Sequence, residues 1–320
     1  MASLRRQAAD EEFHSRMRAP VPLLVRCDSA AGARTSGRSF FGWPGEVDAC
    51  GHLDHRETMA VRRARLAARG MFPVELIGFL QAIVRSGCSI LISGSPSAGK
   101  TTFLIELSSM IPAGERLVTV EKGVLELRFE DDTERHHDVV ALHARQGNTE
   151  GTGEIGVRRL IELARRLNPD RVFLGELIDN EAVDMLDAAS MCKQGSMATI
   201  HARDPESALP RLAYYIGKAN GTLPEYAMWS LIAETLDYVI HVDLIRNSTD
   251  RHQAPQRRVT SVIEIGGLGE RGGVRSTELW ATDDAGQLAR TGAAMSERHA
   301  RRLRLAGFDP RQFPPSERFG

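Results

Sequence analysis

The feature that most constrains this chain is a glycine-containing loop placed between an expected strand and an expected helix. Residues 94–101 read Gly-Ser-Pro-Ser-Ala-Gly-Lys-Thr and match the pattern G-x-x-x-x-G-K-[ST]. The apolar run 88–93 before the loop has the length of a buried strand, and residues 102–110 after it are apolar at helical spacing. In this arrangement the backbone N–H groups of a helix N-terminus meet an anion. We therefore expect the chain to bind a nucleoside triphosphate.

Each residue type in the loop has a physical task in binding phosphate. Glycines let the backbone curl so that its N–H groups point at the phosphates. Lys100 is expected to reach the β- and γ-phosphates, and the Thr101 hydroxyl is expected to ligate Mg²⁺. The residues predicted to bind the nucleotide are Gly94, Ser95, Pro96, Ser97, Ala98, Gly99, Lys100, Thr101 and Thr102.

Composition narrows the class of protein. The chain has 320 residues, enough for one large domain or two modest ones, and its 42% apolar content supports a packed core. The net charge of −1 favours no specific nucleic acid. The four cysteines lack metal-like spacing, which favours a reduced, cytoplasmic protein. No apolar stretch approaches the length of a membrane span, and the N-terminus lacks a signal-peptide core, so we expect any membrane contact to be peripheral.

The chain divides into three parts by pattern. Residues 1–60 are predicted to be an irregular or truncated N-terminal segment, and residues 61–245 an α/β domain. Strands are expected at 88–93, 117–120, 138–142, 171–174 and 196–200. Helices are expected at 57–69, 74–84, 102–110, 157–167, 180–191 and 204–215. This alternation predicts an α/β fold with a largely parallel sheet.

Residues 246–320 are predicted to be a small C-terminal region. A polar linker at 246–258 is followed by expected strands at 259–265 and 276–280. A basic helix over 296–305 closes the pattern.

Two further motifs end predicted strands with polar residues. The strand 171–174 leads into Gly175-Glu176, and a carboxylate at that place can position water or contact Mg²⁺. Taken alone, Glu176 has the alternative of being an acid that caps the next helix. The strand 196–200 ends at His201, whose imidazole can donate a hydrogen bond to a γ-phosphate, although a lone strand-end histidine is more often structural.

Together and in this order, the three motifs resemble the type II/IV secretion ATPases. More narrowly, they resemble the branch that energises Flp/Tad pilus assembly and conjugation-like channels. The stretches 111–121, 150–155 and 158–166 are also similar to that family, and the resemblance covers about residues 70–310. It implies a RecA-like motor domain that binds ATP and Mg²⁺ between the subunits of a homo-hexamer.

The resemblance also implies roles for individual residues. Glu176 would be the catalytic or water-orienting carboxylate and a Mg²⁺ contact, and His201 would sense the γ-phosphate. Glu121 would belong to an acidic box near Mg²⁺ and water, with Glu126 as its second glutamate. Arg145 matches an arginine that faces the nucleotide, and an arginine supplied by a neighbouring subunit could offset transition-state charge.

The function implied is that of an ATPase motor. It would couple ATP hydrolysis to export or pilin assembly, with inner-membrane platform proteins of a secretion or pilus system as partners. Its location would be cytoplasmic, with peripheral contact at the inner face of the cell membrane.

Departures from the family pattern keep an alternative open. Lys122 follows Glu121 where the family usually has aspartate, Ile178 stands where arginine is common, and Cys192-Lys193 replaces a Gly-His pair. Each is expected to remove a polar group from the neighbourhood of the nucleotide or of a subunit interface. The alternative is a degenerate ATP-binding paralogue that acts as a structural or regulatory subunit with little hydrolysis. A third hypothesis, a small-molecule kinase, calls for an arginine-rich acceptor lid, and the sequence between the core strands contains no such lid.

Overall fold

A computed structural model describes residues 70–149, 152–219, 221, 223–245, 255–270, 272–283 and 286–313. The expectations for residues 1–60, for a helix at 57–69 and for most of the linker, 246–254, fall outside these residues. Everything that follows concerns the described part of the chain.

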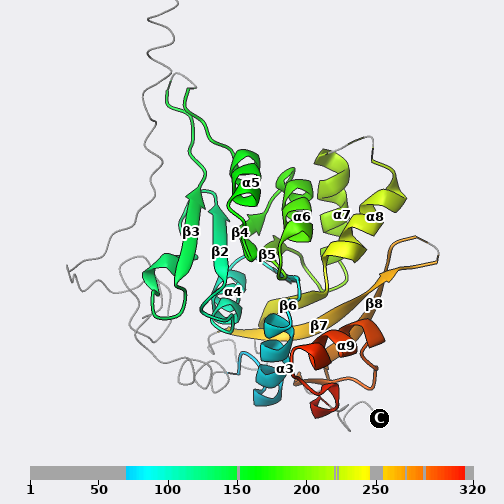
Figure 1. The fold of residues 1–320 in the computed structure, drawn as a ribbon. Coiled ribbons are helices and arrows are strands. Elements are labelled where there is room, and N and C mark those ends of the chain that lie inside the picture. The colour runs from blue at the N-terminus through cyan, green and yellow to red at the C-terminus, as the bar shows by residue number, and fades with distance from the viewer. Residues whose placement is uncertain are drawn as a thin grey trace, which may run out of the picture. The chain divides into compact units, whose positions relative to one another are not determined.

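The described strands form one sheet in the order β3-β2-β4-β5-β1-β6-β7-β8-β9 (Figure 1). Six neighbouring strands are parallel. They are β1 (Ile90–Gly94), β2 (Arg116–Glu121), β3 (Asp138–His143), β4 (Arg171–Leu177), β5 (Met197–His201) and β6 (Tyr238–Ile245). The remaining three extend the sheet with antiparallel pairing and are β7 (Gln256–Leu268), β8 (Val274–Thr282) and β9 (Leu288–Arg290).

Helices cover both faces of the sheet (Figure 1). One face carries α5 (Val157–Arg166), α6 (Glu181–Met191), α7 (Ala208–Ala219) and α8 (Glu225–Thr235). The other carries α3 (Val74–Arg85), α4 (Lys100–Ser108) and α9 (Glu297–Leu305). Short 3-10 turns lie at η1 (Phe129–Asp131) and η2 (Pro310–Gln312). No described helix combines the length and the apolar character needed to cross a membrane.

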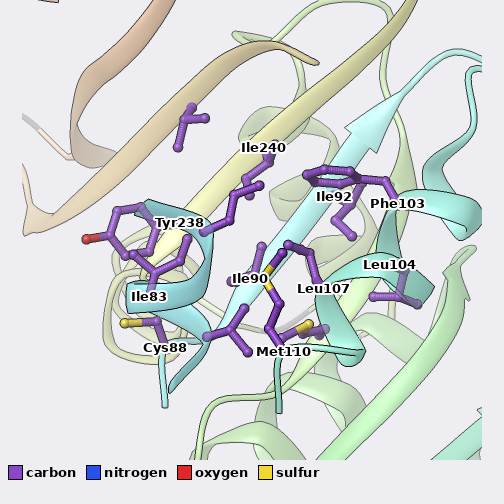
Figure 2. Packing of buried hydrophobic residues seen from close by; sticks show 14 of the residues in the cluster. Ile83, Cys88, Ile90, Ile92, Phe103, Leu104, Leu107, Met110, Tyr238 and Ile240 are labelled. Carbon is purple, nitrogen blue, oxygen red and sulfur yellow. The ribbon is translucent and has the colours of Figure 1, made fainter. Parts of the chain in front are cut away.

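Two hydrophobic cores follow from strand alternation. Successive side chains of a strand point to opposite faces, so Ile90 and Ile92 enter one core and Leu91 enters the other. Figure 2 shows the first core, in which Phe103 and Leu107 of α4 pack beside β1 and β6. Because all of these side chains are buried, α4 is held firmly against β1. This packing fixes the position of the loop that joins the two elements.

Most predicted elements are confirmed within a few residues, and the α/β fold with a mostly parallel sheet is confirmed. The strand order agrees with the RecA-like core that the resemblance implies. Three observed elements were not predicted from the sequence: α8, β6 and β9. It was wrong to place residues 256–258 in a linker, because they begin β7 and pair with β6. The division of the chain at residue 245 stays a prediction, and the strands on either side of it belong to one sheet.

Candidate functional site

The phosphate loop begins where β1 ends, at the carboxyl edge of the parallel strands. Gly94 is the last residue of β1 and lies in register between His201 of β5 and Val242 of β6. A Cβ added to Gly94 would lie 2.1 Å from the carbonyl oxygen of Val242, so a side chain cannot fit there. Gly99 precedes α4 with φ of +95°, a conformation that favours glycine. The motif glycines are therefore required by close approach at one end and by backbone conformation at the other.

Lys100 lies 7% exposed at the start of α4 and bonds to two groups of the site. Its Nζ donates to the carbonyl oxygen of Ser95 at 3.0 Å and lies 3.0 Å from Nδ1 of His201. Because an ammonium group can only donate, Nδ1 is the acceptor and the ring proton sits on Nε2. Burial lowers the pKa of Lys100, while the charges of Glu176 and Glu126 oppose that shift. A buried ammonium at the N-terminus of a helix is well suited to an anionic ligand.

Glu176 is aimed at His201 by an irregularity in β4. The pairing of β4 with β5 shifts register within residues 174–177, so that β4 carries one extra residue there. The Thr199 hydroxyl donates to the carbonyl oxygen of Gly175 at 2.6 Å and holds this distortion. Bulges of this kind re-aim side chains beside functional sites. As a result Oε1 of Glu176 contacts Nε2 of His201, which completes a chain of polar contacts from Lys100 to Glu176.

Glu121 organises the segment that follows β2. Its Oε1 accepts hydrogen bonds from the backbone N–H groups of Glu126 at 2.9 Å and Leu127 at 3.1 Å. Burial raises the pKa of the Glu121 carboxyl, and these two bonds only partly offset the effect. A Cβ on Gly175 would lie 3.4 Å from Glu121 Cγ, so Glu121 lies against the bulge that carries Glu176. Glu126 is exposed to solvent.

Arg145 lies apart from the other predicted site residues. It is exposed, follows the edge strand β3 and forms an isolated bridge with Ile155. Four strand spacings separate β3 from β1, which is about 19 Å at roughly 4.8 Å per strand. Within one chain Arg145 is therefore not at the phosphate loop, and its role toward a neighbouring subunit stays a prediction.

Thr101 and Thr102 lie in the first turn of α4 and are partly exposed. Within the described ranges there is no group of three or more His, Cys, Asp or Glu residues that could hold a metal ion by itself. A Mg²⁺ ion at this loop would therefore take most of its ligands from phosphate and water, which is its usual preference beside nucleotides.

One departure from the family pattern proves to be remote from the loop. Cys192 and Lys193 lie between α6 and the start of β5, at the amino edge of the parallel strands. The Nζ of Lys193 is 3.4 Å from Oδ1 of Asp170, which precedes β4 at the same edge. Lys193 is therefore not beside the phosphate loop of its own chain, and the expectation that this change removes a polar group from a subunit interface stays a prediction. By contrast, Lys122 and Ile178 are exposed just beyond the carboxyl ends of β2 and β4.

Arg257 is a residue of this site that sequence reasoning missed. It lies in β7, and its Nε donates to the carbonyl oxygen of Ser97 in the phosphate loop at 3.1 Å. The sequence offers no local signal for this contact, because only the register of β7 on β6 brings residue 257 beside residue 97.

The chain matches the family described as Type II/IV secretion system protein over residues 55–303. It belongs to this family. A "Putative conjugal transfer protein" of Mycobacterium tuberculosis is 32% identical over 220 residues, covering 69% of this chain and 58% of that protein. The type IV secretion system protein PtlH of Bordetella pertussis is 33% identical over 193 residues, covering 59% of this chain and 54% of PtlH. The chain thus spans little more than half the length of these curated relatives.

A solved structure extends the comparison. The VirB11 ATPase from the Brucella suis type IV secretion system, crystallised in complex with sulphate, is 26% identical with a TM-score of 0.49. The similarity covers 65% of this chain and 56% of that one.

Proposed function

We propose that this chain binds ATP with Mg²⁺ at its phosphate loop and hydrolyses it, as the motor of a type II/IV secretion or Flp/Tad pilus assembly system. The observation that supports this most directly is the chain of contacts from Lys100 through His201 to Glu176. These contacts join the ammonium group of Lys100, which can bind phosphate, to the carboxylate of Glu176, which can orient a water molecule. Family membership and the names of the relatives point the same way.

The residues divide the chemistry among them. Mg²⁺, held by the Thr101 hydroxyl, Glu176 and the phosphates, would offset the charge that develops on the transferred phosphoryl group. Lys100 would neutralise the β- and γ-phosphates from its buried position. Glu176 would orient the attacking water, and His201 would hold that carboxylate in place and sense the γ-phosphate. Hydrolysis by this scheme is catalysis by positioning and charge.

Two more groups would complete the site. Glu121 accepts a hydrogen bond from the backbone of Glu126 and lies against Gly175, and the charge of the exposed Glu126 acts on Lys100. Arg145, remote from the loop of its own chain, would act on the nucleotide of a neighbouring subunit in a homo-hexamer. An arginine supplied in this way can raise turnover by about 10³ to 10⁵-fold in other phosphoryl-transfer enzymes.

The proposal extends to the cellular setting. The motor would act at the cytoplasmic face of the inner membrane, in peripheral contact with it, against platform proteins of the system it serves. The relatives are described as a conjugal transfer protein and as type IV secretion proteins, which supports a role in export or pilin assembly.

A degenerate paralogue with little hydrolysis is the second candidate. The exposed Lys122 and Ile178 favour it, because both lie at the carboxyl edge of the sheet where the family carries groups of other chemistry. The remote position of Lys193 weakens it, since that departure leaves the loop unaltered.

The test is steady-state ATP hydrolysis by the full chain, measured with and without vesicles of acidic phospholipid. Lys100→Ala is expected to weaken ATP binding by about 100-fold or more, because the phosphates lose their buried counter-charge. Lys193→Ala is the matched control: it removes the same side chain from the opposite edge of the sheet. It should change neither binding nor turnover.

The outcomes separate the two candidates. Turnover that depends on Lys100 supports the motor. Tight, Lys100-dependent ATP binding without turnover in folded, assembled protein supports the degenerate subunit. ATP affinity that is unchanged in Lys100→Ala would contradict both, because the loop would then not be the binding site.

A further inference from the structure

Arg257 reaches the phosphate loop from the antiparallel part of the sheet. It pairs with Leu244 in the β6–β7 ladder, and β6 is the neighbour of β1. Its Nε donates to the carbonyl oxygen of Ser97 at 3.1 Å. A Cβ added to Gly99 would lie 2.9 Å from Arg257 Cδ, so the aliphatic stem of the arginine lies across Gly99. The side chain thus touches the loop at its tip and at its junction with α4.

The tip that Arg257 contacts is a strained turn. The Ala98 N–H donates to the carbonyl oxygen of Ser95 at 3.2 Å, which closes a four-residue turn with Pro96 second and Ser97 third. Ser97 has φ of +61°. Proline at the second position and a positive φ at the third are the preferences of a type II turn, which normally places glycine third. A serine there costs backbone strain energy, and the bond from Arg257 holds the carbonyl of that same residue.

The same turn also positions Lys100. The carbonyl oxygen of Ser95 accepts both the Ala98 N–H and the Lys100 ammonium at 3.0 Å. A change in the turn at Ser97 would therefore move an acceptor that holds the main phosphate-binding cation. The shape of the loop and the position of Lys100 are linked through one carbonyl group.

We propose that Arg257 is a positioning residue of the nucleotide site. It holds the phosphate loop in its binding conformation by donating a hydrogen bond to Ser97, and its charge is not what the loop requires. This inference rests on the proposed function, because it assigns the residue to the same nucleotide site. It also makes β7 a structural support of the loop.

The experiment separates the hydrogen bond from the charge. Arg257→Gln places an amide N–H at the position of the arginine Nε and removes the charge. Arg257→Met has a side chain of similar reach with neither donor nor charge. Titration of the full-length protein with a fluorescent ATP analogue is expected to give a Kd within about twofold of the wild type for Arg257→Gln. For Arg257→Met the Kd should rise about fivefold to tenfold, the range of one lost hydrogen bond.

A second variant tests the strain directly. Glycine adopts a positive φ without strain, so Ser97→Gly added to Arg257→Met should recover most of the lost affinity. The kcat of Arg257→Met at saturating ATP should stay within about twofold of the wild type while KM rises, because the residue acts on binding. Arg275→Met is the matched control, since Arg275 of β8 also donates to a backbone carbonyl, that of Gly266 at 2.8 Å, away from the loop.

The effect of Arg257 on the loop can also be measured without any nucleotide. Hydrogen exchange of the backbone amides within residues 94–100 should be faster in Arg257→Met than in the wild type, and near wild type in Arg257→Gln. Equal weakening by glutamine and methionine, with no recovery from Ser97→Gly, would overturn the proposal in favour of direct charge contact with phosphate. Methionine that matches the wild type in both Kd and exchange would overturn it as well.

Failure of the proposed function gives a different pattern. If the wild-type protein binds no ATP analogue, the nucleotide site itself is refuted. The exchange rates of the two variants then still decide whether Arg257 holds the loop.

Discussion

Charged groups lie at both edges of the parallel sheet, but they differ in their exposure to solvent and in their hydrogen-bond partners. At the carboxyl edge, the side chains of Glu176 and His201 are about one-third exposed, and His201 contacts both Glu176 and the buried ammonium of Lys100. At the amino edge, Asp237 precedes β6 and its residue is 2% exposed. Four donors surround its carboxylate: the backbone N–H of Ser89 and the side chains of Arg298, His299 and Arg302.

The two edges differ in how far their charged groups are paired within the protein. Around Asp237 the donors and acceptors are matched within the protein, since His299 also contacts Glu264 at 2.8 Å and Arg302 donates to the carbonyl oxygen of Ser86. This network fastens α9 to the starts of β1 and β6. At the carboxyl edge the polar chain stays accessible to solvent, and the N-terminus of α4 opens onto it. At the amino edge the charged groups bond to one another, and the carboxyl edge is where we propose that the nucleotide binds.

The largest expected effect on folding is at the amino edge. Asp237→Ala leaves the buried His299 and the partly exposed Arg298 and Arg302 without their shared buried acceptor, so the free energy of unfolding should fall by about 3–5 kcal/mol. ATP affinity per folded molecule should stay within about twofold. Denaturant unfolding and calorimetric titration measure the two quantities. Asp309→Ala, which removes a carboxylate paired with the exposed Arg311, is the control and should leave the free energy of unfolding almost unchanged, because solvent screens this pair. A loss of ATP affinity in Asp237→Ala would contradict the separation of the edges.

The matching experiment at the carboxyl edge is Glu176→Gln. Turnover should fall by about 100-fold or more, because the amide cannot act as a base toward water, while ATP still binds. Steady-state hydrolysis and equilibrium binding on the same preparation provide the comparison, and stability should change little at this partly exposed position. If turnover survives, Glu176 is not the catalytic carboxylate, and Glu121 becomes the next candidate.

The free energy of unfolding should depend on pH through the ionisable groups around Asp237 at the amino edge. Burial lowers the pKa of His299, but its bonds to Asp237 and Glu264 outweigh burial and raise it above its ordinary 6.5. This stabilising contribution is complete below pH 6.5 and is lost as the pH rises through the raised value. Burial raises the pKa of the Asp237 and Glu264 carboxyls, but hydrogen bonds from His299 outweigh burial. The pKa of Asp237, which also feels the charge of Arg302, is lowered below its ordinary 3.8, and the pKa of Glu264 is lowered below its ordinary 4.5. Their contribution is present above those values and is lost as the pH falls through the lowered ones.

The cluster is therefore expected to stabilise the fold most between about pH 4.5 and 6.5. Thermal unfolding measured across pH 3–9 would follow the loss of stability on the acidic limb, below this range, and on the alkaline limb, above it. His299→Gln should flatten the alkaline limb, since it removes the group whose charge is lost there. An alkaline limb that keeps its slope in this variant would assign the effect to other groups.

The smallest effect is expected from restoring a family residue at the amino edge. Lys193→His should change kcat for ATP by less than about twofold, because position 193 lies at the opposite edge from the phosphate loop. Its contact with the half-buried Asp170 is a single ion pair made by an exposed lysine, worth less than about 1 kcal/mol. A change of fivefold or more in kcat would show that the two edges communicate.

Much of the fold could be predicted because its signals are local. The run 88–93 is apolar over the length of a strand, and the loop 94–101 carries its own pattern. Prediction failed where a segment depends on a distant partner. Residues 256–258 look like a polar linker, yet they become strand because β6 supplies their hydrogen-bond partners. In β6 itself His241 interrupts the apolar pattern, and it is buried because its Nδ1 meets the Ser93 hydroxyl at 2.9 Å.

The chemical groups that are available, and the order in which they follow the strands, can be read directly from the sequence. It indicated the phosphate loop, Glu176 and His201 because each follows a recognisable local pattern. The tertiary structure alone decided which groups meet. Lys100 and His201 are 101 residues apart, and Ser97 and Arg257 are 160 apart. Local propensity reaches only a few residues along a chain, whereas the register of neighbouring strands and the packing of helices set these distances.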